Sequence, residues 1–172
     1  MEIQDETIKL RPFELEDAEE HLAGEDEEQI KWLSGGKGTI EGVRDWIKKN
    51  KEQWENNGHI LNFAITDKQS GKLLGMIEAN GHSQELEGLE EGDVNISYGL
   101  YPFARGKGYA TNAVNLILKF LKEKGFKRAI IKVNPNNKDS LKIPLRCGFV
   151  EGKTIITKDK EKLIIFRKDL QD

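Results

Sequence analysis

The residues with the clearest chemical potential in this chain are Arg105, Gly106, Lys107 and Gly108, which stand between an expected strand and an expected helix. The start of a helix presents unsatisfied backbone N–H groups and a positive partial charge. Glycines let those N–H groups approach a bulky anion without a Cβ in the way, and the two basic side chains would add positive charge. The stretch therefore predicts a cradle for a phosphate or diphosphate. The alternative is an ordinary glycine-rich connection with two exposed basic residues.

Two standard nucleotide motifs do not fit this part of the chain. A dinucleotide-binding turn needs G-x-G-x-x-G/A and an acidic residue about 20 positions further on. Here Thr111 stands at the third glycine position and Asn134 stands where the acid should be. A P-loop needs G-x-x-x-x-G-K-[ST], and the glycine-rich stretch at 35–38 lacks both the first glycine and the spacing. The predicted cradle therefore belongs to another kind of site.

Candidates for metal or nucleophilic chemistry are scattered along the chain. His21, His59 and His82 are widely spaced and form no H-x-x-x-H pair, so no metal site is predicted. Cys147 is the single cysteine, which excludes an intramolecular disulfide. Because no histidine is close to Cys147 in sequence, we expect a buried structural thiol there and not a nucleophile.

The hydrophobic pattern predicts the elements that hold the glycine stretch. Residues 94–100 alternate apolar and polar side chains, as a strand does, and apolar residues at 110–121 follow helical spacing. The apolar run at 129–133 is typical of a central strand covered on both faces. Other strands are expected at 7–10, 60–66, 72–79, 149–156 and 163–167, and other helices at 14–23, 39–56 and 137–146.

Two of these elements carry more specific expectations. Thr39 is a suitable N-cap for the helix that follows it. In the strand at 60–66, Leu61, Phe63 and Ile65 alternate with polar Asn62 and Thr66. That alternation predicts a half-buried strand with one solvent-facing side.

The order of the expected elements is β-α-α-β-β-β-α-β-α-β-β. It predicts a mixed α/β (α+β) fold, with a mostly antiparallel central sheet of about six to seven strands and about four flanking helices. Since domains usually have about 100–200 residues, the 172 residues are expected to form a single domain over 1–172.

Charge and composition narrow the class of protein. The chain has 27 Lys+Arg and 30 Asp+Glu, a net charge of −3, which argues against a nucleic-acid binder. We expect no signal peptide and no membrane span, and the single cysteine fits a cytoplasmic location. Acidic residues gather at 14–28 and basic residues at 119–132. These clusters are either solvated helix faces, or an acidic rim for a cation and a basic region for an anion.

A third pattern does fit the glycine stretch. The sequence R-x-x-G-x-A at Arg105, Gly108 and Ala110 resembles the coenzyme A diphosphate motif of the GNAT N-acetyltransferase superfamily. The segment VNPNNKDSLKIPLRCGFVEGK resembles the second signature of that superfamily. In it, Asn137 and Ser140, three residues apart, open a helix that ends in Gly-Phe.

The opening segment IKLRPFELEDAEE is similar to the branch that contains the ribosomal-protein N-terminal acetyltransferases. The resemblance covers nearly the whole chain, is strongest over 94–152, and implies a GNAT fold. It also implies direct transfer of an acetyl group from acetyl-CoA, as cosubstrate, to a primary amine on a protein N-terminus or a small molecule. No metal would be needed, and a homodimer is possible because the family often dimerises.

The resemblance also assigns cofactor-binding roles. Leu100, at a strand end, would pair its backbone with the pantetheine arm, and its N–H would face the thioester carbonyl. Asn137 would hydrogen-bond the same arm, and Ser140 would lie near the sulfur. Backbone N–H groups of one continuous run would bind the diphosphate; the run consists of Arg105, Gly106, Lys107, Gly108, Tyr109 and Ala110.

The catalytic groups are assigned less directly. A lysine-like amine has a pKa of about 10.4, so its deprotonation at pH 7 costs on the order of 4–5 kcal/mol and calls for a base or a water chain. Many family members carry a general-acid tyrosine where this chain has Pro144, so Ser140 or a water would protonate the thiolate. Relatives often carry an acid where this chain has Asn95.

Glu78, on the neighbouring strand, is the first candidate for the base, with a solvent-facing glutamate as the alternative. Tyr98 is the second candidate, with a core tyrosine as the alternative. Because the usual acid and base positions are changed, the rival function is a CoA-binding protein without acetyltransferase activity.

Overall fold

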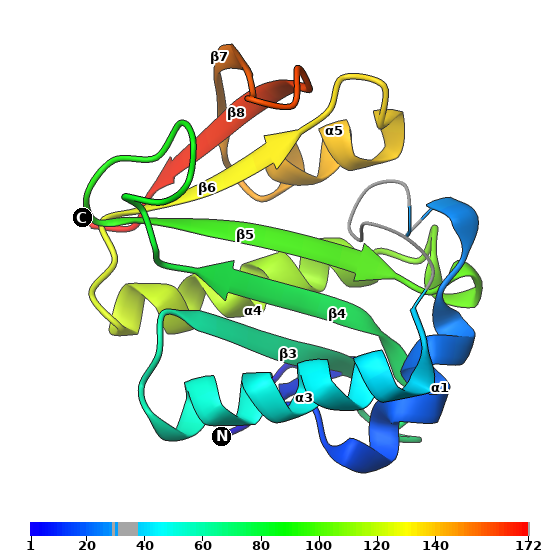
Figure 1. Ribbon diagram of the computed structural model, residues 1–172. Coiled ribbons are helices and arrows are strands. Elements are labelled where there is room, and N and C mark those ends of the chain that lie inside the picture. Colours follow the sequence, from blue (N-terminus) through cyan, green and yellow to red (C-terminus); the bar gives the residue numbers. More distant parts are fainter. Residues whose placement is uncertain (29, 31–37, 172) are drawn as a thin grey trace.

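The computed structural model describes residues 1–28, 30 and 38–171. In this part of the chain eight strands form one sheet in the order β1-β2-β3-β4-β5-β6-β8-β7, with helices on both faces (Figure 1). The strands are β1 (Ile3–Gln4), β2 (Ile8–Arg11), β3 (Ile60–Asp67), β4 (Leu73–Asn80), β5 (Asp93–Leu100), β6 (Arg128–Val133), β7 (Val150–Ile156) and β8 (Lys162–Asp169). The helices are α1 (Ala18–Gly24), α3 (Ile40–Glu55), α4 (Tyr109–Glu123) and α5 (Lys138–Arg146), with short 3-10 turns η1 (Leu15–Asp17) and η2 (Pro102–Ala104).

Among the described strands, β5 and β6 pair in parallel and the other neighbours pair antiparallel. This topology confirms the predicted mixed fold with a mostly antiparallel sheet. The predicted count of about six to seven strands is too low because β1 has only two residues, too few for a periodic pattern. The strand β1 is set by tertiary pairing, with Ile3 opposite Leu10 of β2.

Strand β3 is buried on both faces, so the prediction of a half-buried strand is wrong. Phe63 packs against Phe120 of α4, with ring centroids 5.5 Å apart. On the other face, the Asn62 amide donates to Asn50 Oδ1 of α3 at 3.1 Å. Because α3 and α4 cover opposite faces of the sheet (Figure 1), the polar Asn62 is only 1% exposed. The alternating side chains of β3 therefore face two buried layers, one under α4 and one under α3, and neither face is the solvent-facing side that we predict.

A second, smaller core lies beneath α1 and α3, next to the end of β5. Tyr101 is fully buried, and its hydroxyl lies 2.6 Å from His21 Nδ1. The His21 ring stacks on Trp46 at 5.0 Å and meets Phe13 edge-on at 5.3 Å. Burial lowers the pKa of His21, and nearby Glu25 and Asp17 oppose this effect. Since Tyr101 directly follows Leu100, this core fixes the position of the strand end.

Helix α3 starts at the predicted N-cap. The Thr39 hydroxyl accepts a hydrogen bond from the Gly42 N–H at 3.1 Å, which satisfies one of the unpaired donors at the helix start. Of the glycine-rich stretch at 35–38, Gly38 alone is described, and its N–H donates to the Glu25 carboxylate at 3.1 Å.

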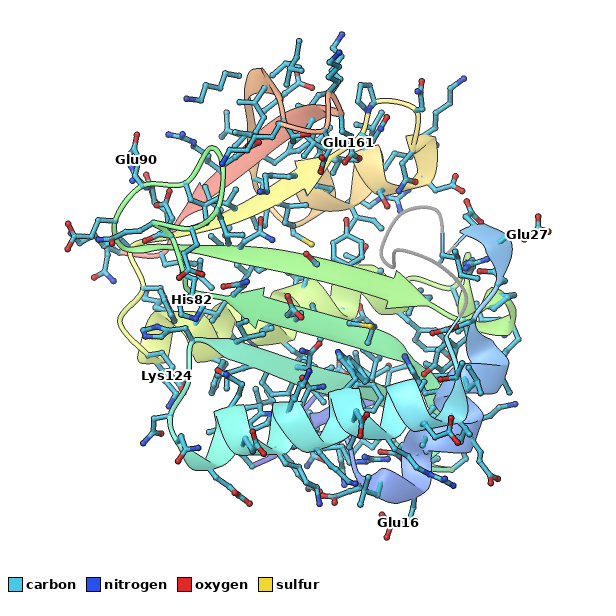
Figure 2. All side chains as sticks on the ribbon, in the orientation of Figure 1. Glu16, Glu27, His82, Glu90, Lys124 and Glu161 are labelled. Carbon is cyan, nitrogen blue, oxygen red and sulfur yellow. The ribbon has the colours of Figure 1, made fainter. Side chains whose placement is uncertain are left out.

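Most charged residues of the two clusters are exposed, whereas Asp17 of the acidic cluster is buried and Lys132 of the basic cluster lines a cavity. Glu16 and Glu27 in the acidic segment, and Lys124 in the basic one, point away from the sheet (Figure 2). The basic residues at 119–124 lie at the C-terminal end of α4, the opposite end of that helix from the glycine stretch. Within the described residues, no helix has the length and apolar character needed to cross a membrane.

Candidate active site

A cavity of about 710 Å³ opens where β5 and β6 separate. These strands pair in register only from Asp93 opposite Arg128 to Asn95 opposite Ile130, and beyond this point their ribbons diverge (Figure 1). The cavity is lined by the facing edges of these strands, which are residues 96–100 of β5 and residues 131–134 at and just after the end of β6. Unpaired strand edges present backbone N–H and C=O groups, so the walls can pair with an extended ligand. The volume is typical of a small-molecule site.

The glycine stretch forms one end of this cavity. Gly106 and Gly108 both line it and have φ values of +75° and +82°, which favour glycine. A Cβ at either position would meet no atom within 4 Å, so the space beside both is open. The Asn112 N–H donates to the Gly108 carbonyl at 3.1 Å. The N–H groups at 109–111 precede this first donor of the helix and therefore have no acceptor within the helix. Such a helix start suits an anion.

The backbone of Leu100 also faces the cavity. The Tyr101 N–H donates to the Leu74 carbonyl of β4 at 2.9 Å. Because successive N–H groups of extended backbone point to opposite sides, the Leu100 N–H points away from β4, toward the gap between β5 and β6. Leu100 itself lines the cavity.

The Arg105 side chain is bound to protein groups. Its Nε donates to the Leu100 carbonyl at 3.1 Å, and its terminal nitrogens donate to the two carboxylate oxygens of Asp26 at 2.6 and 2.8 Å. Glu28 lies 3.2 Å from the same guanidinium. These carboxylates offset the positive charge that the sequence suggests for Arg105. Lys107 is exposed and lies outside the described lining.

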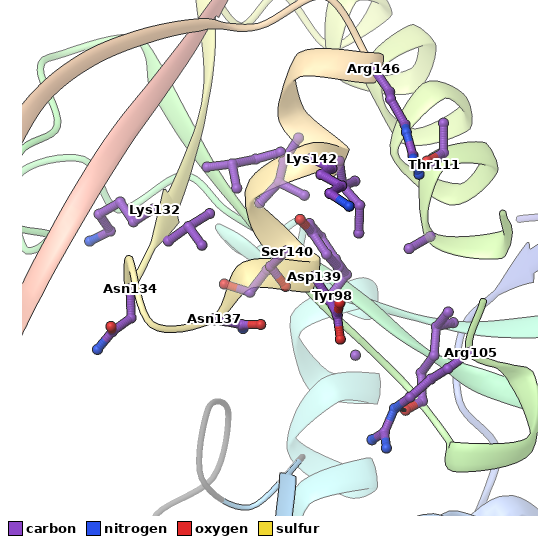
Figure 3. A pocket seen from close by; sticks show the side chains of 18 of the residues that line it. Tyr98, Arg105, Thr111, Lys132, Asn134, Asn137, Asp139, Ser140, Lys142 and Arg146 are labelled. Atoms are coloured by element: carbon purple, nitrogen blue, oxygen red, sulfur yellow. Dashed lines mark hydrogen bonds between the residues drawn. The ribbon is translucent and has the colours of Figure 1, made fainter.

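Positive charge reaches the cavity from Lys132, the last member of the basic cluster, and from two residues that the sequence does not single out. Lys142 and Arg146 line the cavity from α5, and their i, i+4 spacing places them on one face of that helix. The Arg146 guanidinium points toward Thr111 at the start of α4 (Figure 3). The signal that could have found them is this basic pair within the expected helix at 137–146.

Tyr98, Asn137 and Ser140 meet in the middle of the cavity, where β5 faces the start of α5 (Figure 3). Burial raises the pKa of Tyr98, and its interaction with the Ser140 side chain opposes this rise. A phenol with a raised pKa stays protonated at neutral pH, so Tyr98 does not suit the role of base that the sequence offers for it, and its hydroxyl is buried. Pro144, one turn after Ser140, has no N–H to offer the Ser140 carbonyl.

Glu78 lies one strand away from the cavity. In the sheet it stands between Asn62 of β3 and Ser97 of β5, and Ser97 lines the cavity. The Asn62 amide donates to Glu78 Oε2 at 2.9 Å. Burial raises the pKa of the Glu78 carboxyl, and this hydrogen bond opposes the rise. The half-buried carboxylate is therefore held beside the cavity on the α3 face of the sheet.

Two further sequence candidates play no direct part in the lining. Tyr109 packs against the main core, although its backbone opens α4. Cys147 is 5% exposed, and burial raises its pKa to about 11 against the opposing effect of Lys168, so it is the buried thiol that we predict. No group of three or more His, Cys, Asp or Glu among the described residues is placed to hold a metal ion.

Comparison with known families identifies the class of protein that this fold and cavity define. A family model described as the acetyltransferase (GNAT) domain matches residues 7–150. The chain belongs to the GNAT acetyltransferase family. The predicted family, fold and enzyme class, an N-acyltransferase, are thereby confirmed.

Individual relatives agree with this assignment. A probable N-acetyltransferase of Bacillus subtilis (strain 168), YjcK, is 29% identical over 154 residues, which cover 86% of this chain and 82% of that protein. The ribosomal-protein-S5-alanine acetyltransferase of Vibrio fischeri shares 19% identity at a TM-score of 0.81, over 100% of this chain and 98% of the other. The microcin C7 self-immunity acetyltransferase MccE, solved with acetyl-CoA and AMP, shares 22% identity at a TM-score of 0.80, over 96% and 93%.

Proposed function

We propose that the protein transfers the acetyl group of acetyl-CoA to a primary amine, and that the coenzyme lies in the cavity between β5 and β6. One observation carries this proposal: the cavity runs from the glycine-lined start of α4, along the open edge of β5, to Ser97 beside Glu78. The solved complex of MccE with acetyl-CoA supports it by analogy of fold.

The coenzyme would be bound mainly by backbone groups. Its diphosphate would lie on the amides of residues 105–110, with Lys142 and Arg146 facing the negative charge. The pantetheine amides would pair with the open edge of β5 and with the Asn137 side chain. The Leu100 N–H would then donate to the thioester oxygen, where negative charge develops during attack.

The acceptor amine must lose a proton as its nitrogen bonds to the acetyl carbon. Only about one lysine-like amine in 2,500 is neutral at pH 7. Glu78 is the group that would accept the proton, through the Ser97 hydroxyl or a bridging water, because Ser97 stands between it and the cavity. A peptide α-amine, with a pKa of about 8, would need less help than a side-chain-like amine.

The coenzyme sulfur leaves as a thiolate when the C–S bond breaks. Ser140 or a water would protonate it, because the helix position where many family members carry a tyrosine is occupied here by Pro144. The buried Tyr98 phenol beside Ser140 would help to hold the Ser140 side chain in place.

A thiol-release assay with acetyl-CoA tests this function. The acceptor panel contains a peptide with a free N-terminus, a polyamine and an aminoglycoside, and we expect thiol release that depends on at least one of them. The second candidate, a CoA-binding protein without activity, is favoured by Pro144 at the usual acid position. Tight CoA binding with no acceptor-dependent release would support that candidate and contradict acetyl transfer.

A further inference from the structure

One side chain of the candidate coenzyme site is held by a part of the chain 79 positions away. Arg105 and Asp26 form a two-pronged pair at 2.6 and 2.8 Å, and both side chains are about 30% exposed. Asp26 stands just after α1, which ends at Gly24. A Cβ on Gly24 would lie 2.4 Å from the Tyr101 ring, so the end of α1 is packed closely on the residue that follows Leu100.

Arg105 connects the two working ends of the proposed coenzyme site, one through its guanidinium and the other through its backbone. Its Nε donates to the Leu100 carbonyl at 3.1 Å, and Leu100 is the residue whose N–H would face the thioester. Arg105 is also the first residue of the run that would bind the diphosphate. Because the guanidinium is planar and its donors are fixed relative to one another, the position of the Asp26 carboxylate sets the geometry at both places.

We propose that Asp26 is a positioning residue for the coenzyme: through Arg105 it holds the end of β5 and the start of the glycine stretch at the spacing that coenzyme A requires. This inference rests on the proposed function, because it assumes that coenzyme A occupies the cavity. The competing account is that Asp26 and Glu28 only neutralise Arg105. Under that account, removing the Asp26 carboxylate would leave Glu28 as an ion-pair partner of Arg105, increase the positive charge near the diphosphate and tighten binding.

The chain contains a matched control for this test. Arg11 and Asp17 form a second two-pronged pair, at 2.7 and 2.9 Å, between β2 and η1, and neither residue is part of the described cavity lining. Asp26→Asn and Asp17→Asn therefore each remove one charge from an Arg–Asp pair of similar geometry. Calorimetric titration with coenzyme A, at a temperature where both variants are folded, compares them directly.

We expect Asp26→Asn to weaken coenzyme A binding about tenfold, since a charge-assisted two-pronged bond is lost, while Asp17→Asn changes it less than about twofold. Asp26→Glu should restore part of the affinity, because the carboxylate is kept. Unchanged or tighter binding in Asp26→Asn would overturn the proposal. If that variant does not fold, Arg105→Lys replaces it: lysine keeps the charge but cannot bind Asp26 and Leu100 in the same geometry, and wild-type affinity there would overturn the proposal too.

The same titration separates this inference from the proposed function. If the wild-type protein binds no coenzyme A, both are wrong. If the wild type binds and Asp26→Asn binds equally well, the coenzyme site stands and only the positioning role of Asp26 is lost.

Discussion

The two parts of the proposed site are built in different ways. The proposed coenzyme half consists of consecutive backbone groups at 105–110, two glycines with positive φ and the N-terminus of α4. The proposed acceptor half is a row of side chains on three strands, in which Ser97 lines the cavity and Glu78 and Asn62 stand behind it in cross-strand register. A site made of consecutive backbone can be recognised in a short stretch of sequence. A site made by register cannot, since its members are separated by 16 and 19 positions.

The largest effect should come from the backbone of the coenzyme half. Gly108→Val should weaken coenzyme A binding by about 100-fold or more, because the added side chain would fill the space that the diphosphate needs. Calorimetric titration measures the dissociation constant.

The control for that change is Gly71→Val, in the turn between β3 and β4. Gly71 also has positive φ, at +75°, and a Cβ there also meets no atom within 4 Å. Both variants should lose about 1–3 kcal/mol of unfolding free energy, but only Gly108→Val should lose affinity. Equal affinity in the two variants would contradict the cradle.

The acceptor half should respond in turnover and not in coenzyme binding. Glu78→Gln should lower turnover about 100-fold at pH 7, within the usual range for loss of a general base, and leave the coenzyme A dissociation constant unchanged. The pKa of Glu78 is raised, so wild-type turnover should fall as the pH drops through that raised value, when the carboxylate takes up its proton.

At high pH the amine deprotonates without help, so the rates of Glu78→Gln and the wild type should converge as the pH approaches the amine pKa of about 10. The control is Glu85→Gln, which removes an exposed carboxylate from the β4–β5 connection. Parallel pH–rate profiles for Glu78→Gln and the wild type would remove Glu78 as the base.

A moderate effect should separate the charge that lines the cavity from the basic residues at the C-terminal end of α4. Arg146→Gln should weaken coenzyme A binding about five- to tenfold and reduce its salt dependence, since one cation near the phosphates is lost. Lys124→Gln, at the far end of α4, should change neither. Equal effects of the two substitutions in titrations at 50 and 500 mM salt would show that only overall charge matters.

The smallest effect concerns His21, which lies in the smaller core and contacts Tyr101. Because the pKa of His21 is lowered in the folded protein, the unfolded chain binds a proton at this histidine at a higher pH than the folded protein does. Its contribution to stability is therefore complete above the unfolded pKa of about 6.5 and is lost as the pH falls from there through the lowered folded pKa. The expected loss is on the order of 1 kcal/mol.

Urea unfolding at pH 7.5 and 5.5 measures this loss. His21→Phe should flatten the dependence on pH, whereas substitution of the exposed His59 by glutamine should not. If His21→Phe keeps the wild-type slope, another group is responsible. These unfolding measurements also distinguish a loss of stability at low pH from the loss of turnover that protonation of Glu78 should cause.

The sequence predicts most elements of this fold because their hydrophobic patterns are long. The helix at 109–123 and the strand at 93–100 lie within one to two residues of their expected bounds. The glycine stretch is predictable for a further reason. Positive φ values before the start of a helix favour glycine, so this backbone geometry is visible in the sequence as glycine residues. The burial of Asn62 is not predictable in this way, because it depends on the packing of α3 over that face of the sheet. No local sequence pattern in β3 indicates this packing.

Long-range ion pairs cannot be predicted from local sequence patterns either, because they too depend on tertiary packing. Arg105 looks like a free cation in its own segment, and its partner Asp26 lies in an acidic cluster that reads as a solvated surface. The pair becomes visible only once α1 is packed against Tyr101. Lys142 and Arg146 were within reach of the sequence, since their spacing on one helix face is local.

The central claim is that the start of α4 binds the diphosphate of coenzyme A, and a crystal structure of the complex tests it most directly. The account predicts diphosphate oxygens within hydrogen-bond distance of the amides at 106–110, with the pantetheine arm between β5 and β6. A diphosphate bound away from this loop, or an empty cavity at saturating coenzyme A, would contradict it.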